Sequence, residues 1–228
     1  MVCITAWSTL PFRNWLAPRS AGTRLRRALA SPVCAIVKTR NVPEVVYYVA
    51  ASVDGYIATP DGGIEWLAPF EGSGEDYGYA QFYESVGAVL LGRRTYETSL
   101  AFEEWPYPGK PCWVFSHGNV RSLSPDVTRT AQSPAQIVSE MAARGLQRAW
   151  LVGGGALAAS FRSDGLISEY IVTIVPVILG AGVPLFADAG PPESLKLVEA
   201  KSYPKGLVQL RYLRADTPYE LSALRSAR

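Results

Sequence analysis

Two glycine-marked segments carry residue types suited to binding an anionic ligand. Gly92-Arg93-Arg94-Thr95 follows the apolar run 86–91, and Gly153-Gly154-Gly155-Ala156 follows the strand-like run 148–152. Each lies where a strand-like pattern gives way to a helix-like one, and in an α/β sheet such junctions lie at the carboxyl ends of strands, where ligands bind. Free backbone N–H groups there suit phosphate oxygens, and the first segment adds two guanidinium groups and a hydroxyl. The pair of segments therefore predicts a ligand with several phosphates.

Each segment also has a simpler interpretation. A helix N-terminus is partly positive, so Arg93 and Arg94 stand at its unfavourable end unless they are solvated or face an anion. Gly153, Gly155 and Ala158 fit the dinucleotide pattern G-x-G-x-x-G/A. A Rossmann domain, however, has its glycines after an early strand and an acidic residue about 20 positions on. Here the glycines come late in the chain, so the Rossmann fold stays a minor alternative.

Composition argues against several other functions. The first acidic residue is Glu44, and after the seven basic residues that precede it the chain has 15 basic and 20 acidic residues, a net charge of −5. A nucleic-acid-binding domain would normally carry a clustered basic face. The single histidine (His117) and three separated cysteines argue against a zinc site and a disulfide framework. We therefore expect no metal, no nucleic-acid partner and a reducing, cytoplasmic setting.

The charge-free stretch 170–187 is long enough to raise the question of a membrane span. Prolines and glycines interrupt it, and the β-branched run 171–175 favours a strand. We expect a buried strand followed by a glycine/proline turn, and no membrane partner.

The elements needed to position the two segments alternate along the chain. Strands are expected at 45–51, 86–91, 112–116, 148–152 and 169–175, and helices at 76–86, from 92, at 133–145 and at 156–161. Ser133, Pro134 and Gln136 give the clearest helix start, a capping box with proline at the first position. The runs 195–203 and 207–214 predict a terminal β-hairpin. This order predicts an α/β domain with a mostly parallel central sheet and a C-terminal antiparallel hairpin.

The ends of the chain fall outside this pattern. Residues 1–43 are acid-free and rich in arginine, as organelle transit peptides are, but we favour an unstructured extension or a start assigned too far upstream. We expect an extension at 1–43, the domain at 44–215 and a tail at 216–228.

The chain resembles the dihydrofolate-reductase-like superfamily, specifically the reductase domain at the C-terminus of bifunctional riboflavin-biosynthesis proteins and its standalone relatives. The resemblance covers about residues 45–214. It rests on "VAASVDGYIA" (49–58), "VLLGRRTYE" (89–97), "WVFS" (113–116), "WLVGGGAL" (150–157) and "IVPVILGAGVPLF" (174–186).

This resemblance implies a three-layer fold that binds NADPH. Ala50 and Ile57 would approach the nicotinamide, and Ser116, with His117 beside it, would lie around the adenosine ribose. Arg93 would contact the 2′-phosphate and Thr95 the pyrophosphate, within a segment (Gly92, Arg93, Arg94, Thr95) that holds the adenine-side phosphates. The second segment would hold the pyrophosphate and the nicotinamide side through Gly153, Gly154, Gly155, Ala156 and Leu157. The resemblance also implies a cis peptide between Gly153 and Gly154.

The proton donor has less support in the sequence. Asp76 is the candidate catalytic acid, next to Glu75 and ahead of the expected first helix; its alternative role is that of a helix N-cap. The expected activity is NADPH-dependent hydride transfer to a C=N or C=O group of a small pterin-, pyrimidine- or ribosylamino-like molecule. The alternative is an NADPH-binding module of this fold without turnover. A homodimer through the terminal hairpin is a further expectation.

Overall fold

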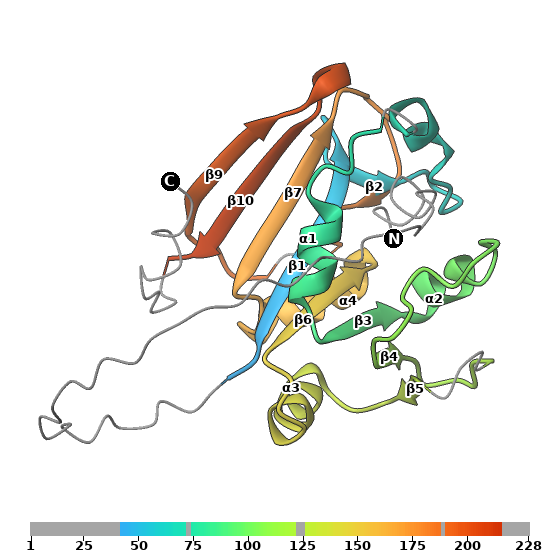
Figure 1. The fold of residues 1–228 in the computed structure, drawn as a ribbon, viewed down its shortest axis with the longest axis vertical. Coiled ribbons are helices and arrows are strands. Elements are labelled where there is room, and N and C mark those ends of the chain that lie inside the picture. Colours follow the sequence, from blue (N-terminus) through green and yellow to red (C-terminus); the bar gives the residue numbers. More distant parts are fainter. Residues whose placement is uncertain (1–41, 72–73, 122–125, 188–189, 216–228) are drawn as a thin grey trace, which may run out of the picture.

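The fold is built on one eight-stranded sheet (Figure 1). The computed structural model describes residues 42–71, 74–121, 126–187 and 190–215, so the expectations for 1–41 and 216–228 lie outside the described residues. The order of strands across the sheet is β5–β4–β3–β6–β1–β7–β10–β9. Their bounds are β1 Glu44–Ser52, β3 Ala88–Gly92, β4 Cys112–Phe115, β5 Val127–Thr130, β6 Arg148–Gly153, β7 Glu169–Val175, β9 Leu195–Ser202 and β10 Val208–Arg214.

The six strands from β5 to β7 are parallel, and β10 and β9 finish the sheet as an antiparallel hairpin. This confirms the predicted fold class. β1 lies in the interior of the sheet, with Tyr47 paired with Leu151 of β6 on one side and Tyr170 of β7 on the other. Its residues from Val45 to Ser52 are all buried, as expected for a parallel strand covered on both faces.

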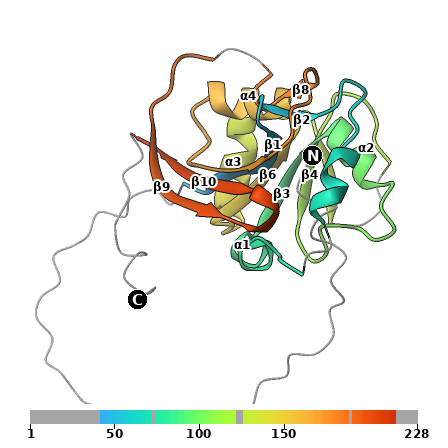
Figure 2. The same cartoon turned by 90° about the horizontal axis from the view of Figure 1, so that it is seen from above.

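Helices cover both faces of the sheet (Figure 2). α1 (Tyr79–Ser85) packs on one face, and α3 (Pro134–Ala143) and α4 (Gly155–Ser163) lie on the other. α2 (Arg93–Ser99) directly follows β3. The predicted capping box of α3 is confirmed: Ser133 and Gln136 exchange side-chain and backbone hydrogen bonds.

An aromatic cluster joins α1 to its face of the sheet. The Trp150 side chain is fully buried and donates its indole N–H to the carbonyl of Tyr48 at 3.0 Å. The rings of Phe82 and Tyr79 meet Trp150 edge to face, with centroids 5.6 and 5.7 Å away. These large apolar groups supply much of the burial that holds α1 in place.

Three local features differ from the sequence expectations. α1 begins at Tyr79 rather than near Asp76, because Tyr77 (φ 52°) and Gly78 (φ 83°) have left-handed backbone that a helix cannot contain. β5 was not predicted. The expected turn after β7 contains a short strand, β8 (Val183–Pro184), which pairs with another unpredicted strand, β2 (Tyr56–Ala58).

The β2–β8 pair depends on a missing side chain. A Cβ atom at Gly182 would overlap the carbonyl oxygen of Ala58, so only glycine allows the two segments to approach this closely. The charge-free stretch 170–187, which raised the question of a membrane span, thus contains most of the strand β7 and a loop that is held in place by the β2–β8 pair. Within the described ranges, no helix combines the length and apolar character needed to cross a bilayer.

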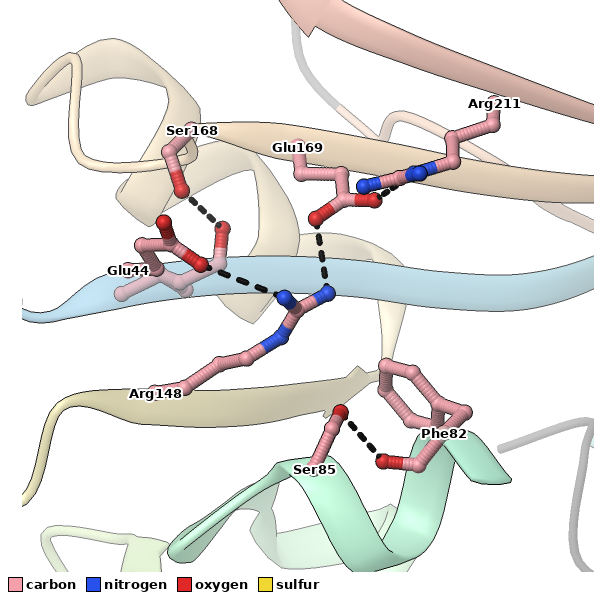
Figure 3. Close-up of polar contacts among 8 residues, drawn as sticks. Glu44, Phe82, Ser85, Arg148, Ser168, Glu169 and Arg211 are labelled. Carbon is pink, nitrogen blue, oxygen red and sulfur yellow. Dashed lines mark hydrogen bonds and ion pairs between the residues drawn. The ribbon is translucent and has the colours of Figure 1, made fainter. Parts of the chain in front are cut away.

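A chain of charged side chains joins the amino ends of three parallel strands (Figure 3). The Glu169 side chain is only 4% exposed; it accepts from Nη2 of Arg148 at 2.8 Å and from Nε of Arg211. Arg148 also reaches Glu44 at 3.3 Å. Because these residues begin β6, β7 and β1, the cluster marks the edge of the sheet opposite the two glycine segments.

Candidate functional site

The two glycine segments predicted from the sequence meet at one edge of the sheet. β3 and β6 are parallel neighbours, with Leu91 opposite Gly153. A Cβ atom at Gly92 would lie 3.3 Å from the carbonyl oxygen of Gly153 and 3.6 Å from the nitrogen of Gly154. The peptide between Gly153 and Gly154 is cis, as predicted. The end of β3 therefore lies directly against this peptide, with no side chain between them.

Thr95 joins the same surface from α2. It is 2% exposed, and its hydroxyl oxygen lies 3.6 Å from where a Cβ atom at Gly154 would be. Its carbonyl accepts a hydrogen bond from the Ser99 hydroxyl, which fixes the first turn of α2. The structure thus brings together Gly92, Thr95 and Gly154, three of the predicted cofactor residues.

The end of β4 adds Ser116 to this edge. Phe115 pairs with Gly92 across the sheet, so Ser116 follows at the same level. The Ser116 hydroxyl donates to the carbonyl of Gly118 at 2.9 Å. From β5, Nη1 of Arg129 donates to the carbonyls of Ser116 and His117, at 3.2 and 3.4 Å. The loop after β4 is therefore held in shape, and β5 brings a third arginine to this end of the sheet.

Arg93 is the first residue of α2, and its side chain lies beside the loop after β4. Its Nε donates to Oε1 of Glu97 at 2.7 Å, and about half of each side chain is exposed. Its Nη1 lies 2.9 Å from where a Cβ atom at Gly118 would be. Arg94 is exposed, and its side chain has no hydrogen bond or ion pair with any residue that the structure describes. Because α2 has only seven residues, its dipole is weak, and the two cations are less unfavourable there than the sequence suggested.

α4 supplies the second helix start at this edge. Gly155 is its first residue, and a Cβ atom there would lie 2.7 Å from the carbonyl of Pro184. Ala156 is exposed and Leu157 is half-buried. The N-terminus of α4 therefore packs against the end of β8, with its first free N–H groups beside the cis peptide.

These features fit the phosphates of a dinucleotide. Glycines open a close approach to backbone atoms, the first turn of the nine-residue α4 offers N–H donors, and the edge at β3, β4 and β5 carries Arg93, Arg94 and Arg129. In the described ranges, no three His, Cys, Asp or Glu side chains are grouped to hold a metal ion.

On the face of the sheet that α1 covers, a row of three residues lies beside this edge. Ala50, Thr173 and Gln209 are in register across β1, β7 and β10. The Gln209 amide donates to the hydroxyls of Thr173 and Tyr48, both at 3.1 Å. Ala50 is 7% exposed, and Ile57 on β2 is 1% exposed. Their approach to a nicotinamide ring stays a prediction.

The carboxylates ahead of α1 are engaged with backbone. Asp76 accepts from the N–H of Gly78 at 2.9 Å and of Ala80 at 3.2 Å, and Glu75 accepts from the N–H of Tyr77 at 3.1 Å. The N-cap of α1 is Gly78, so Asp76 is not the N-cap that was its expected alternative role; it lies two residues earlier and its carboxylate accepts from Ala80 in the first turn. Its role as a proton donor stays a prediction.

Asp54 ties the end of β1 to the loop after β7. Its carboxylate accepts from the N–H of Leu179 at 3.1 Å and of Gly180 at 2.7 Å. The Ser52 hydroxyl, followed by these two N–H groups, holds the pKa of Asp54 below its ordinary value. The Asp54 side chain therefore stabilises the two loops that meet at the end of β1.

Sequence reasoning missed three residues of this region, Glu97, Arg129 and Gln209. Glu97 stands one helical turn after Arg93, and that i,i+4 spacing was a signal available from the sequence. Arg129 lies on the unpredicted β5, and Gln209 reaches the row on the α1 face only through strand register, so neither could be assigned from local pattern.

The fold, with its two glycine segments meeting at one edge of the sheet, defines a dihydrofolate-reductase-like α/β protein. Dihydrofolate reductase from Enterococcus faecalis, solved in complex with NADP(H), shares the fold with a TM-score of 0.56 at 15% identity, over 78% of this chain and 98% of that one. Residues 43–209 match the RibD C-terminal domain family, and the chain belongs to that family.

Two further relatives match this chain over nearly the whole of their own lengths. The uncharacterized protein YwjB of Bacillus subtilis (strain 168) is 37% identical over 173 residues, which is 75% of this chain and 98% of YwjB. A crystal structure of a protein from Shewanella sp. PV-4, provisionally named a riboflavin biosynthesis protein, is 28% identical with a TM-score of 0.68, over 75% of this chain and 98% of that one.

Proposed function

We propose that the protein is an NADPH-dependent reductase acting on a small polar molecule. The observation that carries the proposal is the contact between the Gly92 end of β3 and the Gly153–Gly154 peptide, flanked by Arg93 and Thr95. This arrangement offers backbone donors and guanidinium groups at one sheet edge, as a phosphorylated dinucleotide requires. Membership of the RibD C-terminal domain family and the fold shared with dihydrofolate reductase support it.

The residues divide the binding work between the two segments. Arg93 would hold the 2′-phosphate. The pyrophosphate would be held on one side by Thr95 and Arg94, and on the other side by the cis peptide and the start of α4. Ser116 would orient the adenosine ribose. The bound cofactor supplies hydride to a C=N or C=O carbon of the substrate, while the chain supplies orientation and electrostatics.

The substrate would lie on the α1 face, over the row formed by Ala50, Thr173 and Gln209. Hydroxyl and amide groups in this row suit a heterocycle with several polar edges, such as a pterin, a pyrimidine or a ribosylamino compound. The given name of the Shewanella protein links this family to riboflavin biosynthesis, which favours the pyrimidine class.

A second candidate is a module that binds NADPH without turnover. The engagement of Asp76 with two backbone N–H groups favours it, since a carboxylate bonded in this way is less available to donate a proton. The row of Ala50, Thr173 and Gln209 favours the reductase, because the partly exposed Gln209 amide is a polar group that a substrate could reach.

The test has two stages. NADPH and NADH are first titrated into the protein by calorimetry; NADPH binding in the micromolar range or tighter, with weaker NADH binding, supports the cofactor assignment. NADPH oxidation is then followed at 340 nm with pterins, pyrimidines and ribosylamino compounds. Steady oxidation with one of them supports the reductase, and binding without oxidation across the panel supports the module.

Asp76→Asn separates the two roles of that residue. The amide oxygen still accepts from a backbone N–H, but the side chain cannot deliver a proton. Loss of NADPH oxidation with unchanged NADPH affinity and thermal stability supports the catalytic role. Unchanged oxidation by this variant contradicts it.

A further inference from the structure

The guanidinium group of Arg93 is held on one side only. Nε is bonded to Oε1 of Glu97, whereas Nη1 and Nη2 have no hydrogen-bond partner within the described part of the chain. Those two nitrogens form the end of the fork that binds a phosphate through two parallel hydrogen bonds. Glu97 thus occupies the edge of the guanidinium that a phosphate need not use, and leaves the fork free.

Gly118 also limits where the Nη1 and Nη2 end of the Arg93 side chain can lie. A Cβ atom at this position would lie 2.9 Å from Nη1 of Arg93, closer than side-chain atoms normally approach. Ser116 precedes this glycine by two residues, and its hydroxyl donates to the Gly118 carbonyl. The absence of a side chain at residue 118 therefore lets the fork lie beside the loop that would hold the adenosine ribose.

An unsupported arginine side chain on a helix surface samples many rotamers, and ordering it on binding costs conformational entropy. The hydrogen bond from Nε to Glu97 removes part of that cost before the ligand arrives. The carboxylate also repels a phosphate dianion, but about half of the Glu97 side chain is exposed, so solvent and salt screen this effect.

We propose that Glu97 and Gly118 are positioning residues that direct the Arg93 fork, and so determine how strongly the protein distinguishes NADPH from NADH. This inference rests on the proposed function. Glu97 orients Arg93 by accepting the hydrogen bond from Nε. Gly118 leaves room for Nη1 because it has no side chain. Neither residue needs to touch the cofactor itself.

The test compares Glu97→Gln with Glu97→Ala. Both variants remove the negative charge, so the repulsion of a phosphate changes equally, but only glutamine keeps an acceptor for Nε. Four compounds are titrated by calorimetry: NADPH, NADH, adenosine 2′,5′-bisphosphate and AMP. The second pair isolates the 2′-phosphate from the rest of the cofactor, and melting temperatures check that the fold is intact.

We expect Glu97→Gln to bind NADPH and adenosine 2′,5′-bisphosphate about two- to fivefold more tightly than Glu97→Ala, as expected for one modest hydrogen bond. The two variants should bind NADH and AMP alike. Gly118→Ala should weaken NADPH and adenosine 2′,5′-bisphosphate relative to NADH and AMP, which lack the 2′-phosphate, because the new Cβ atom displaces Nη1. This third variant provides a test that does not depend on how α2 tolerates alanine.

The outcomes separate the inference from the function on which it rests. If the unaltered protein binds NADPH and all three variants keep the same preference over NADH, Glu97 and Gly118 do not direct the fork, while the cofactor assignment stands. If the unaltered protein binds no NADPH, both the proposed function and this inference are wrong.

Discussion

The carbonyl oxygen of Gly153 lies against Gly92, so the ends of β3 and β6 form one continuous backbone surface. Sixty residues separate these glycines in the sequence, and the parallel register of the two strands brings them together. Arg93 and Thr95 lie in the first turn of α2, which starts immediately after Gly92, so their backbone positions are set relative to the cis peptide. A ligand that spans the ends of β3 and β6 therefore contacts both glycine segments.

Arg93→Ala should weaken NADPH binding by roughly 10- to 100-fold, because a charge-assisted contact contributes about 1.5–3 kcal/mol. NADH lacks the 2′-phosphate, so its affinity should hardly change. Titration of both cofactors into the variant checks this. Equal losses for the two cofactors would rule out contact with the 2′-phosphate.

Arg94→Ala should weaken NADPH and NADH to a similar degree if this residue serves the pyrophosphate, which both cofactors share. The exposed Arg94 side chain has no ion pair with the described residues, so its loss should leave the melting temperature within about 2 °C of the original. The same titrations measure the effect. No loss for either cofactor would mean that Arg94 is simply solvated.

Gly92→Ala should weaken both cofactors together, because its Cβ atom would lie 3.3 Å from the Gly153 carbonyl and push the two strand ends apart. Such crowding in a packed region costs about 1–3 kcal/mol of folding stability. Gly87→Ala is the matched control: it lies just before the same strand, where the nearest atom would be a mobile leucine methyl group 3.4 Å away. Cofactor titration and thermal unfolding of both variants test this, and equal effects would contradict it.

Glu169→Gln should destabilise the fold by about 3–5 kcal/mol, because two guanidinium groups would lose the buried carboxylate that pairs with them. Glu44→Gln, whose side chain is 54% exposed, should cost less than about 1 kcal/mol. Urea unfolding of the two variants gives the comparison. Because the cluster lies at the opposite edge of the sheet, folded Glu169→Gln should keep its NADPH affinity, and a large change there would contradict the separation of the two edges.

The free energy of unfolding should fall in alkaline solution, in part through Cys112. Burial, and then the charge of Asp126, raises the pKa of its thiol from 9.0 to about 12. Above pH 9 the unfolded chain loses this proton while the folded chain keeps it, so the stability is complete below pH 9 and is lost as the pH rises toward 12.

Cys112→Ala isolates that contribution. Burial also raises the pKa values of Tyr83 and Tyr170, and these tyrosines remain in the variant. Urea unfolding under reducing conditions at pH 8 and at pH 10.5 should show a smaller loss in the variant than in the unaltered protein. The same loss in both would mean that the thiol does not contribute.

The main elements of the fold could be predicted because their signals are local. The run 169–175 is a strand because its residues are β-branched and apolar, and α3 begins at Pro134 because Ser133 and Gln136 form the capping box. β5 could not be predicted, because its buried residues, Val127 and Thr130, stand three positions apart, which is the spacing of a helix and not the alternation of a strand. β2 and β8 are too short to carry a pattern, and their pairing depends on Gly182, far along the chain from Tyr56.

The candidate site was predictable to the same extent. The glycine segments and Arg93 stand out in the sequence, and the strand order brings them to one edge. The partners that orient them do not stand out. Gln209 reaches Thr173 only through the register of β10 with β7, and Arg129 reaches Ser116 across the β4–β5 pair. Such contacts are properties of tertiary structure and leave no local trace in the sequence.

The interior position of β1 has a consequence for how the chain acquires its structure. Among the described strands β1 is the first to be synthesised, but its neighbours arrive much later: Glu44 meets Arg148 after 104 residues, and Val45 meets Ser168 after 123. Contacts of such sequence separation require large loops to close before they stabilise anything, which slows folding. On the ribosome, the apolar Val45–Ala51 side chains therefore wait without strand partners until β6 has emerged, and refolding in vitro should be limited by this late insertion of β1 between β6 and β7.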